Sequence, residues 1–193
     1  MEAVCVFCGS REGARPAYAE DARSMGKEIA RRGLGLVYGG GRGGLMGAVA
    51  DAVLEEGGEV VGVIPEALVS KEIAHAGLTE LHVVGSMHER KMLMADLSDG
   101  FVTLPGGYGT LEEFMEVLSW AQLSIHEKPC GLLDVDGFWE PLSTLFDQAV
   151  NEGFVQPNHR SLVLTEGNPR VLLERMESYT PPETRKWVGP REL

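Results

Sequence analysis

One stretch decides the fold: GFVTLPGGYGTLEEF, residues 100–114. Residues 100–104 form a short apolar run typical of a buried strand, and Pro105 prevents that strand from continuing. Three glycines follow at Gly106, Gly107 and Gly109, and the apolar spacing from 110 to 125 then predicts a helix. A strand, a glycine turn and a helix in succession are the unit from which parallel α/β sheets are built.

The same alternation of strand and helix runs through the whole chain. It predicts strands at 3–8, 34–38, 59–64, 80–84, 100–104, 129–133 and 161–165, and helices at 16–32, 45–56, 86–97, 110–125, 138–152 and 168–177. Such alternation implies an α/β fold, a doubly wound parallel sheet flanked by helices. We expect a single domain over residues 1–179 and a surface tail, rich in proline and charge, over 180–193.

Composition excludes several classes of function. The 193 residues carry a formal net charge of -12, which argues against a nucleic-acid partner because phosphate neutralisation needs a basic face. The sequence contains neither a signal-peptide pattern nor an apolar run long enough to span a membrane, so we expect a cytoplasmic protein. Cys5 and Cys8 spell C-x-x-C, but residues three apart on a strand point to opposite sides, which favours packing over redox or metal chemistry.

The turn from Pro105 to Thr110 predicts an anion site. Ligands of parallel sheets bind beyond the carboxyl ends of the strands, where this turn lies with Gly9-Ser10 and Gly39–Gly44. The first N–H groups of a helix lack partners within the helix, and its dipole favours an anion there. No Walker lysine follows, which favours a monophosphate held by backbone. The alternative is that Thr110 only caps the helix, but capping would not require three glycines.

A second glycine pattern, G-x-G-x-x-G, is formed by Gly39, Gly41 and Gly44. A dinucleotide site would need an acidic residue about 20 positions later, at the end of the next strand. Glu59 opens that strand, and Glu66 comes only after it has ended, so an NAD-dependent oxidoreductase is disfavoured. Two interpretations stay open: a tight strand–helix turn, or a turn whose N–H groups help to hold a phosphate or ribose.

Charged residues beside the phosphate turn indicate the chemistry. Glu112 and Glu113 lie in the first turn of the predicted helix, and Arg90-Lys91 is a basic pair on the preceding one. Acidic residues often complement a helix dipole, and a basic pair often lies on a solvated face. Together with a phosphate turn, however, they suit cleavage of a sugar C–N bond, because a carboxylate can stabilise an oxocarbenium-like transition state and activate water. An arginine can orient that carboxylate.

At this point the sequence resembles a known family. Residues 38–47 (YGGGRGGLMG), 87–91 (MHERK), 105–113 (PGGYGTLEE) and 120–123 (WAQL) resemble the LOG family of cytokinin riboside 5′-monophosphate phosphoribohydrolases, long mislabelled as possible lysine decarboxylases. The resemblance implies a Rossmann-like homodimer that needs no cofactor or metal. It implies hydrolysis of N6-substituted adenosine 5′-monophosphates, and of AMP itself, to free base and ribose 5-phosphate.

The resemblance also assigns residues. Arg90 and Glu113 match the catalytic pair of the family. The positions that match substrate-binding residues are Glu72, Lys91, Gly106, Gly107, Tyr108, Gly109, Thr110, Leu111, Glu112 and Ser119, the last where plant members carry threonine. The alternative is a non-catalytic nucleotide or molybdenum-cofactor carrier, since such carriers are similar around the P-G-G-x-G-T turn. A carrier would not need the Arg90–Glu113 pair.

Overall fold

The computed structural model describes residues 1–69 and 74–183. Within them, seven strands form one sheet in the order β4-β3-β2-β1-β5-β6-β7, and every neighbouring pair is parallel. The strands are β1 (Ala3–Phe7), β2 (Gly35–Tyr38), β3 (Val60–Pro65), β4 (Glu80–Val84), β5 (Phe101–Thr103), β6 (Cys130–Leu133) and β7 (Val163–Glu166). The predicted parallel α/β sheet in a single domain is therefore confirmed.

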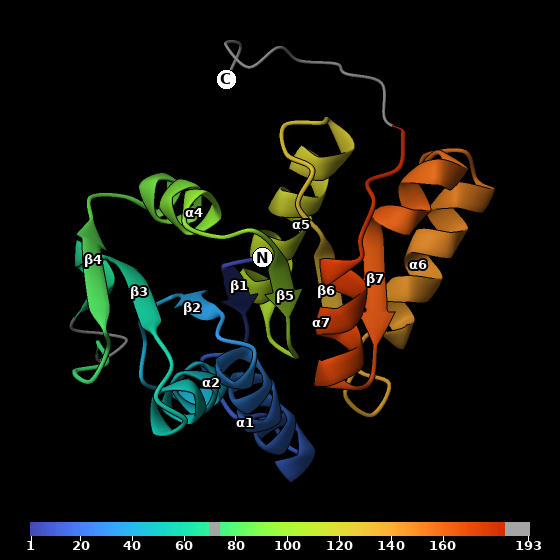
Figure 1. Ribbon diagram of the computed structural model, residues 1–193. Helices are drawn as coiled ribbons and strands as arrows, with labels where there is room; N and C mark the ends of the chain where they lie inside the picture. Colours follow the sequence, from blue (N-terminus) through green and yellow to red (C-terminus); the bar gives the residue numbers. More distant parts are fainter. Residues whose placement is uncertain (70–73, 184–193) are drawn as a thin grey trace.

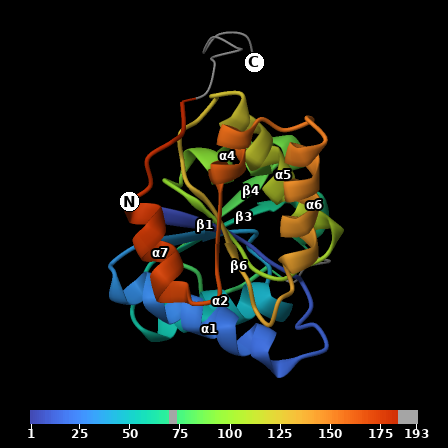
Figure 2. The same cartoon turned by 90° about the vertical axis from the view of Figure 1, so that its right-hand side faces the viewer.

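Helices cover both faces of the sheet, which makes three layers (Figures 1 and 2). One face carries α1 (Pro16–Arg31), α2 (Gly44–Glu55) and α7 (Pro169–Glu177); the other carries α4 (Met87–Asp96), α5 (Tyr108–Gln122) and α6 (Glu140–Asn151). Two short elements not expected from the sequence are α3 (Glu66–Val69) and the 3-10 helix η1 (Pro157–Leu162). None of the helices in the described part of the chain is long and apolar enough to cross a membrane.

The central strand β1 shows why the sequence reads as a continuous apolar run. Val4 and Val6 belong to the core beneath α1 and α2, and Cys5 and Phe7 to the core beneath α4 and α5. Both faces are buried, as parallel sheets require. Cys8 packs in the core opposite to that of Cys5, which confirms that the C-x-x-C pattern serves packing.

The strand order fixes where a ligand can enter. From β1 the chain winds outward through β2, β3 and β4, then returns to place β5 on the other side of β1. The crevice at such a reversal, outside the carboxyl ends of the strands, is the usual ligand site of doubly wound sheets. Here it lies between the turns that follow β1 and β5.

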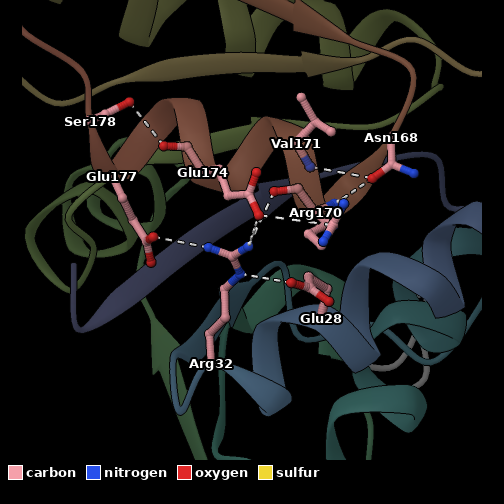
Figure 3. Close-up of polar contacts among 8 residues, drawn as sticks. All are labelled: Glu28, Arg32, Asn168, Arg170, Val171, Glu174, Glu177 and Ser178. Atoms are coloured by element: carbon pink, nitrogen blue, oxygen red, sulfur yellow. Dashed lines mark hydrogen bonds and ion pairs between the residues drawn. The ribbon is translucent and has the colours of Figure 1, made fainter.

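The C-terminal part of the described chain is tied to the body of the fold. Arg32, the residue that caps the end of α1, contacts four partners: Glu28 (2.8 Å), Glu177 (2.9 Å), Glu174 (3.6 Å) and the carbonyl of Arg170 (3.2 Å) (Figure 3). These contacts join α1 to α7. Beyond α7, Asn158 donates to the carbonyl of Glu183 at 2.8 Å. Residues 184–193 lie outside the described residues, so the surface tail stays a prediction.

Candidate active site

Three turns meet at the reversal point of the sheet. The N–H of Gly9 donates to the carbonyl of Pro105 at 3.0 Å, and the N–H of Leu45 donates to the carbonyl of Gly9 at 3.0 Å. These bonds join the turns after β1, β2 and β5, the same three turns that the sequence places at the carboxyl edge. Beside them lies a cavity of about 470 Å³, lined by Gly9, Ser10, Arg11, Glu12, Gly13, Tyr18, Leu45, Pro105, Gly106, Gly107, Tyr108 and Phe138.

The turn after β5 is open where a ligand would approach. Helix α5 begins at Tyr108, two residues earlier than predicted, and its N-cap is Gly107, which has no side chain to cap the first N–H groups. Thr110 is therefore not the cap, which removes the alternative explanation for this turn. A side chain at Gly106 would lie 2.1 Å from the hydroxyl of Thr110, whereas nothing lies within 4 Å of one at Gly107 or Gly109.

Arg90 is seated in the protein by backbone groups. Helix α4 begins with Ser86 as its cap, and Arg90 projects from its first turn into the sheet, where it is 5% exposed. Its Nε donates to the carbonyl of Val63 at 3.1 Å, and its Nη2 donates to the carbonyl of Gly39 at 3.0 Å. Gly39 must be bare, because a Cβ there would lie 2.1 Å from Nη2. A buried guanidinium held in this way is a fixed positive charge at the carboxyl ends of β2 and β3.

Glu113 places a negative charge on α5, which covers the same face of the sheet as the helix of Arg90. It is half-buried on α5, one turn after the glycine turn. Burial and then the charge of Glu113 raise the pKa of the Cys5 thiol, while the charge of Arg90 lowers it. Burial and then Glu113 likewise raise the pKa of the Cys8 thiol. Both charges of the predicted catalytic pair therefore act on β1, at the centre of the sheet.

Lys91 and Glu112, predicted to bind substrate, contact each other. The Nζ of Lys91 lies 2.5 Å from Oε1 of Glu112 and 3.0 Å from Oε1 of Glu116. Burial alone would lower the pKa of Lys91, but the hydrogen bonds to these two carboxylates raise it above its ordinary value. In the structure the ammonium thus joins α4 to α5.

The remaining predicted residues divide into those at the turn and those away from it. Tyr108 is 93% exposed at the mouth of the cavity, and Leu111 follows in the first turn of α5. Ser119 lies nine residues beyond Thr110, about 14 Å along the helix at the usual rise, and donates to the carbonyl of Met115 at 2.7 Å. Glu72 lies outside the described residues. The binding roles of all these residues stay predictions.

The structure adds residues that sequence reasoning did not select. Arg11, Tyr18 and Phe138 line the cavity, and the carbonyls of Gly39 and Val63 hold Arg90. The turn after β1 was recognisable as one of the three at the carboxyl edge, but nothing in the sequence brings Phe138 to it. Among the described residues, no group of three or more histidine, cysteine or acidic side chains could hold a metal ion.

An open doubly wound parallel sheet, with helices on both faces and a cavity at its reversal point, defines a Rossmann-like α/β protein. A family model described as "Possible lysine decarboxylase" matches residues 46–176. The probable cytokinin riboside 5′-monophosphate phosphoribohydrolase LOGL2 of Oryza sativa subsp. japonica is 50% identical over 178 residues, 92% of this chain and 73% of that protein. The cytokinin riboside 5′-monophosphate phosphoribohydrolase LOG5 of Arabidopsis thaliana is 51% identical, over 92% and 78%. The chain belongs to this family, the LOG family.

Solved structures of more distant proteins share the fold. A molybdenum cofactor binding protein from Rippkaea orientalis superposes with a TM-score of 0.68 at 22% identity, covering 92% of this chain and 97% of that one. The molybdenum cofactor carrier protein from Chlamydomonas reinhardtii gives 0.68 at 20% identity, over 91% and 98%. At such low identity the likeness concerns the architecture alone.

Proposed function

We propose that this protein hydrolyses the N-glycosidic bond of adenosine 5′-monophosphates, with or without an N6 substituent, and releases the free base and ribose 5-phosphate. The observation that carries the proposal is the open glycine turn at the start of α5, with Glu113 one turn further on and Arg90 held at the carboxyl ends of β2 and β3. The two plant relatives, about half identical to this chain, are named as a probable cytokinin riboside 5′-monophosphate phosphoribohydrolase and a cytokinin riboside 5′-monophosphate phosphoribohydrolase.

The 5′-phosphate would bind at the turn after β5. Unpaired N–H groups and the helix dipole at the start of α5 attract an anion, and the bare positions Gly107 and Gly109 leave room for it. The chain has no basic surface overall, so the attraction must be local: its net charge is -12. This argument extends to Gly106, Tyr108, Thr110 and Leu111 as the backbone that surrounds the phosphate and ribose.

Glu113 and Arg90 would carry out the cleavage. As the C1′–N9 bond breaks, both of its electrons leave with the base, and the ribose becomes an oxocarbenium-like cation that the Glu113 carboxylate stabilises. Glu113 then takes a proton from water as the water oxygen bonds to C1′, and that proton passes on to the departing base, which restores the carboxylate. The part of Arg90, whose guanidinium offers only donors, is to orient the carboxylate and bind substrate oxygens.

The test is a direct assay with AMP and N6-isopentenyl-AMP, following free base and ribose 5-phosphate. Glu113→Gln is expected to lower turnover by about 10²–10⁴-fold, the usual contribution of a general base, and to leave nucleotide binding largely intact. Glu20→Gln, the same change at an exposed position of α1, is the control. No product from either nucleotide with folded wild-type protein, or full turnover by Glu113→Gln, would refute the proposal. A retained pterin in the purified protein would favour the carrier function.

We also propose that the protein is a homodimer in the cytoplasm. An apolar groove of about 260 Å³ runs between α5, α6 and η1, and its lining includes Met115 (40% exposed) and Leu145 (57% exposed). Exposed apolar area of this kind supports an interface between copies. Trp120 of α5, by contrast, packs against the core of its own chain. Light scattering at several concentrations would measure the oligomeric state.

A further inference from the structure

His75 is a buried histidine between α3 and β4, and it is not among the residues that line the cavity. Its side chain is 8% exposed and bridges two segments. Nδ1 accepts a hydrogen bond from the N–H of Gly77 at 3.0 Å, and Nε2 lies 2.8 Å from Oδ1 of Asp51 on α2. Because Nδ1 is used as an acceptor, the ring proton is on Nε2 and points at the carboxylate. The ring therefore fastens the loop to α2.

The backbone beside His75 is fastened to the turn after β2. The N–H of His75 donates to the carbonyl of Gly40 at 3.1 Å, and Ala74 forms an antiparallel bridge with Gly41. Gly40 has a φ of +75°, a conformation that side-chain-bearing residues rarely adopt. The turn thus has little support from regular structure and depends on contacts from outside.

This turn supplies one of the two backbone carbonyls, those of Gly39 and Val63, that hold the Arg90 guanidinium; together we call them the seat of Arg90. The carbonyl of Gly39, next to Gly40, accepts the hydrogen bond from Nη2 of Arg90 at 3.0 Å. A chain of contacts therefore runs from Asp51 through His75 to the glycine turn and on to the guanidinium. Movement of the turn would move a hydrogen bond that fixes the position of Arg90.

We infer that His75 is a positioning residue, which through Asp51 holds the turn after β2 in the conformation that seats Arg90. The inference rests on the proposed catalytic role of Arg90. His75 has no contact with the cavity that would hold the nucleotide, so its loss should affect turnover far more than substrate binding. A displacement of about 1 Å in a reacting constellation can lower the rate by about 10²-fold.

The experiment compares three variants of the full chain. His75→Ala removes the bridge, and His75→Gln keeps an N–H donor and an oxygen acceptor. His82→Ala is the matched control, because the side chain of His82 also pairs with a carboxylate, Glu80 at 3.2 Å, but on the edge strand β4 and outside the contacts that link Asp51 to the turn. Two measurements are made on each: steady-state kinetics with AMP, and hydrogen–deuterium exchange of peptides spanning 39–45 in the ligand-free protein.

His75→Ala is expected to lower kcat at least about tenfold with little change in KM, and to speed exchange across 39–45. His75→Gln should recover much of both, and His82→Ala should match the wild type. If His75→Ala does not fold, Asp51→Ala tests the same bridge from an exposed position, with the same expectations. Wild-type kcat and wild-type exchange in the bridge variant would overturn the inference. A wild-type protein that does not hydrolyse AMP would instead overturn the proposed function, and the exchange result would still decide whether His75 holds the turn.

Discussion

The two glycine turns after β2 and β5 look alike in sequence, yet their glycines are required for different reasons. After β2, a Cβ at Gly39 would lie 2.1 Å from Arg90, and one at Gly44 would lie 2.3 Å from the backbone N of Arg11. After β5, Gly107 and Gly109 have no neighbour within 4 Å of an added Cβ. Neither adopts a positive φ, so neither is needed for backbone conformation.

This comparison distinguishes glycines that packing requires from glycines that leave room for a ligand. The turn after β2 is closed by the protein's own atoms, which are the guanidinium of Arg90 at Gly39 and the backbone of Ser10 and Arg11 at Gly44. The turn after β5 is left open, and an opening that packing does not require is what a ligand would need. A pattern of glycines therefore locates a turn, but only the surrounding atoms tell whether the turn holds a side chain or a substrate.

The largest effect is expected at the closed turn. Gly39→Ala should displace the Arg90 guanidinium, because the new methyl group would overlap Nη2, and turnover should fall by about 10²-fold or more. Steady-state kinetics with AMP measures the loss. The control is Gly35→Ala on β2, the strand that precedes Gly39, where the nearest atom to an added Cβ is 3.6 Å away. Wild-type turnover in Gly39→Ala would mean that the seat of Arg90 has no part in catalysis.

A smaller effect of a different kind is expected at the open turn. Gly109 lies inside α5 with free space around it, so Gly109→Ala should raise stability by about 0.5–1 kcal/mol through better helix propensity. The same methyl group should weaken AMP binding by about tenfold, equivalent to about 1.4 kcal/mol. Thermal unfolding and calorimetric titration measure the two effects.

Gly26 on α1 provides the opposite case for comparison. A Cβ there would lie 2.5 Å from the carbonyl of Val49, so Gly26→Ala should destabilise the protein by pushing α1 away from α2.

If Gly109→Ala bound AMP as tightly as the wild type, the open space at the turn after β5 would have no connection with the nucleotide.

Sequence reasoning predicted the sheet, its helices and the turns at its carboxyl edge, because alternating patterns are local. It could not predict the seat of Arg90, since Gly39 is 51 residues away in the chain. Arg90 and Lys91 are adjacent in the sequence, but they reach different partners because neighbouring side chains on a helix point about 100° apart. One enters the sheet, and the other crosses to Glu112 on α5.

The position of Ser119 shows a further limit. Resemblance assigns it to the substrate, a role that stays a prediction; in the structure it lies about 14 Å along α5 from Thr110 and lines the apolar groove beside α6. A motif carries the order of residues along the chain without the distance between them in the fold. The start of α5 at Tyr108 was missed for a local reason. Three glycines predict a turn, but the helix takes Gly107 as its N-cap and Gly109 in its first turn.

The last effect is a pH dependence of the free energy of unfolding, and it is caused by His126. Burial lowers the pKa of His126 to about 4, although its Nε2 donates to the carbonyl of Val117 at 2.9 Å, a contact that acts in the opposite direction. Nδ1 accepts from the N–H of Lys128 at 3.1 Å, so the folded ring is neutral. The unfolded chain, with the ordinary histidine pKa of 6.5, binds the extra proton between these two values, and stability therefore falls as the pH drops below 6.5.

The loss from His126 should be about 1 kcal/mol between about pH 7.5 and pH 6, and it should grow until the pH approaches the folded pKa. Urea unfolding at a series of pH values measures it, and His126→Gln should remove this part of the pH dependence. An unchanged slope in His126→Gln would assign the acid sensitivity to other groups. Because the folded ring stays neutral over this range, the proton changes the free energy of unfolding and leaves the folded turns as they are. The stabilities of the glycine variants are therefore best compared above about pH 7.5, where this proton is largely absent from both the folded and the unfolded chain.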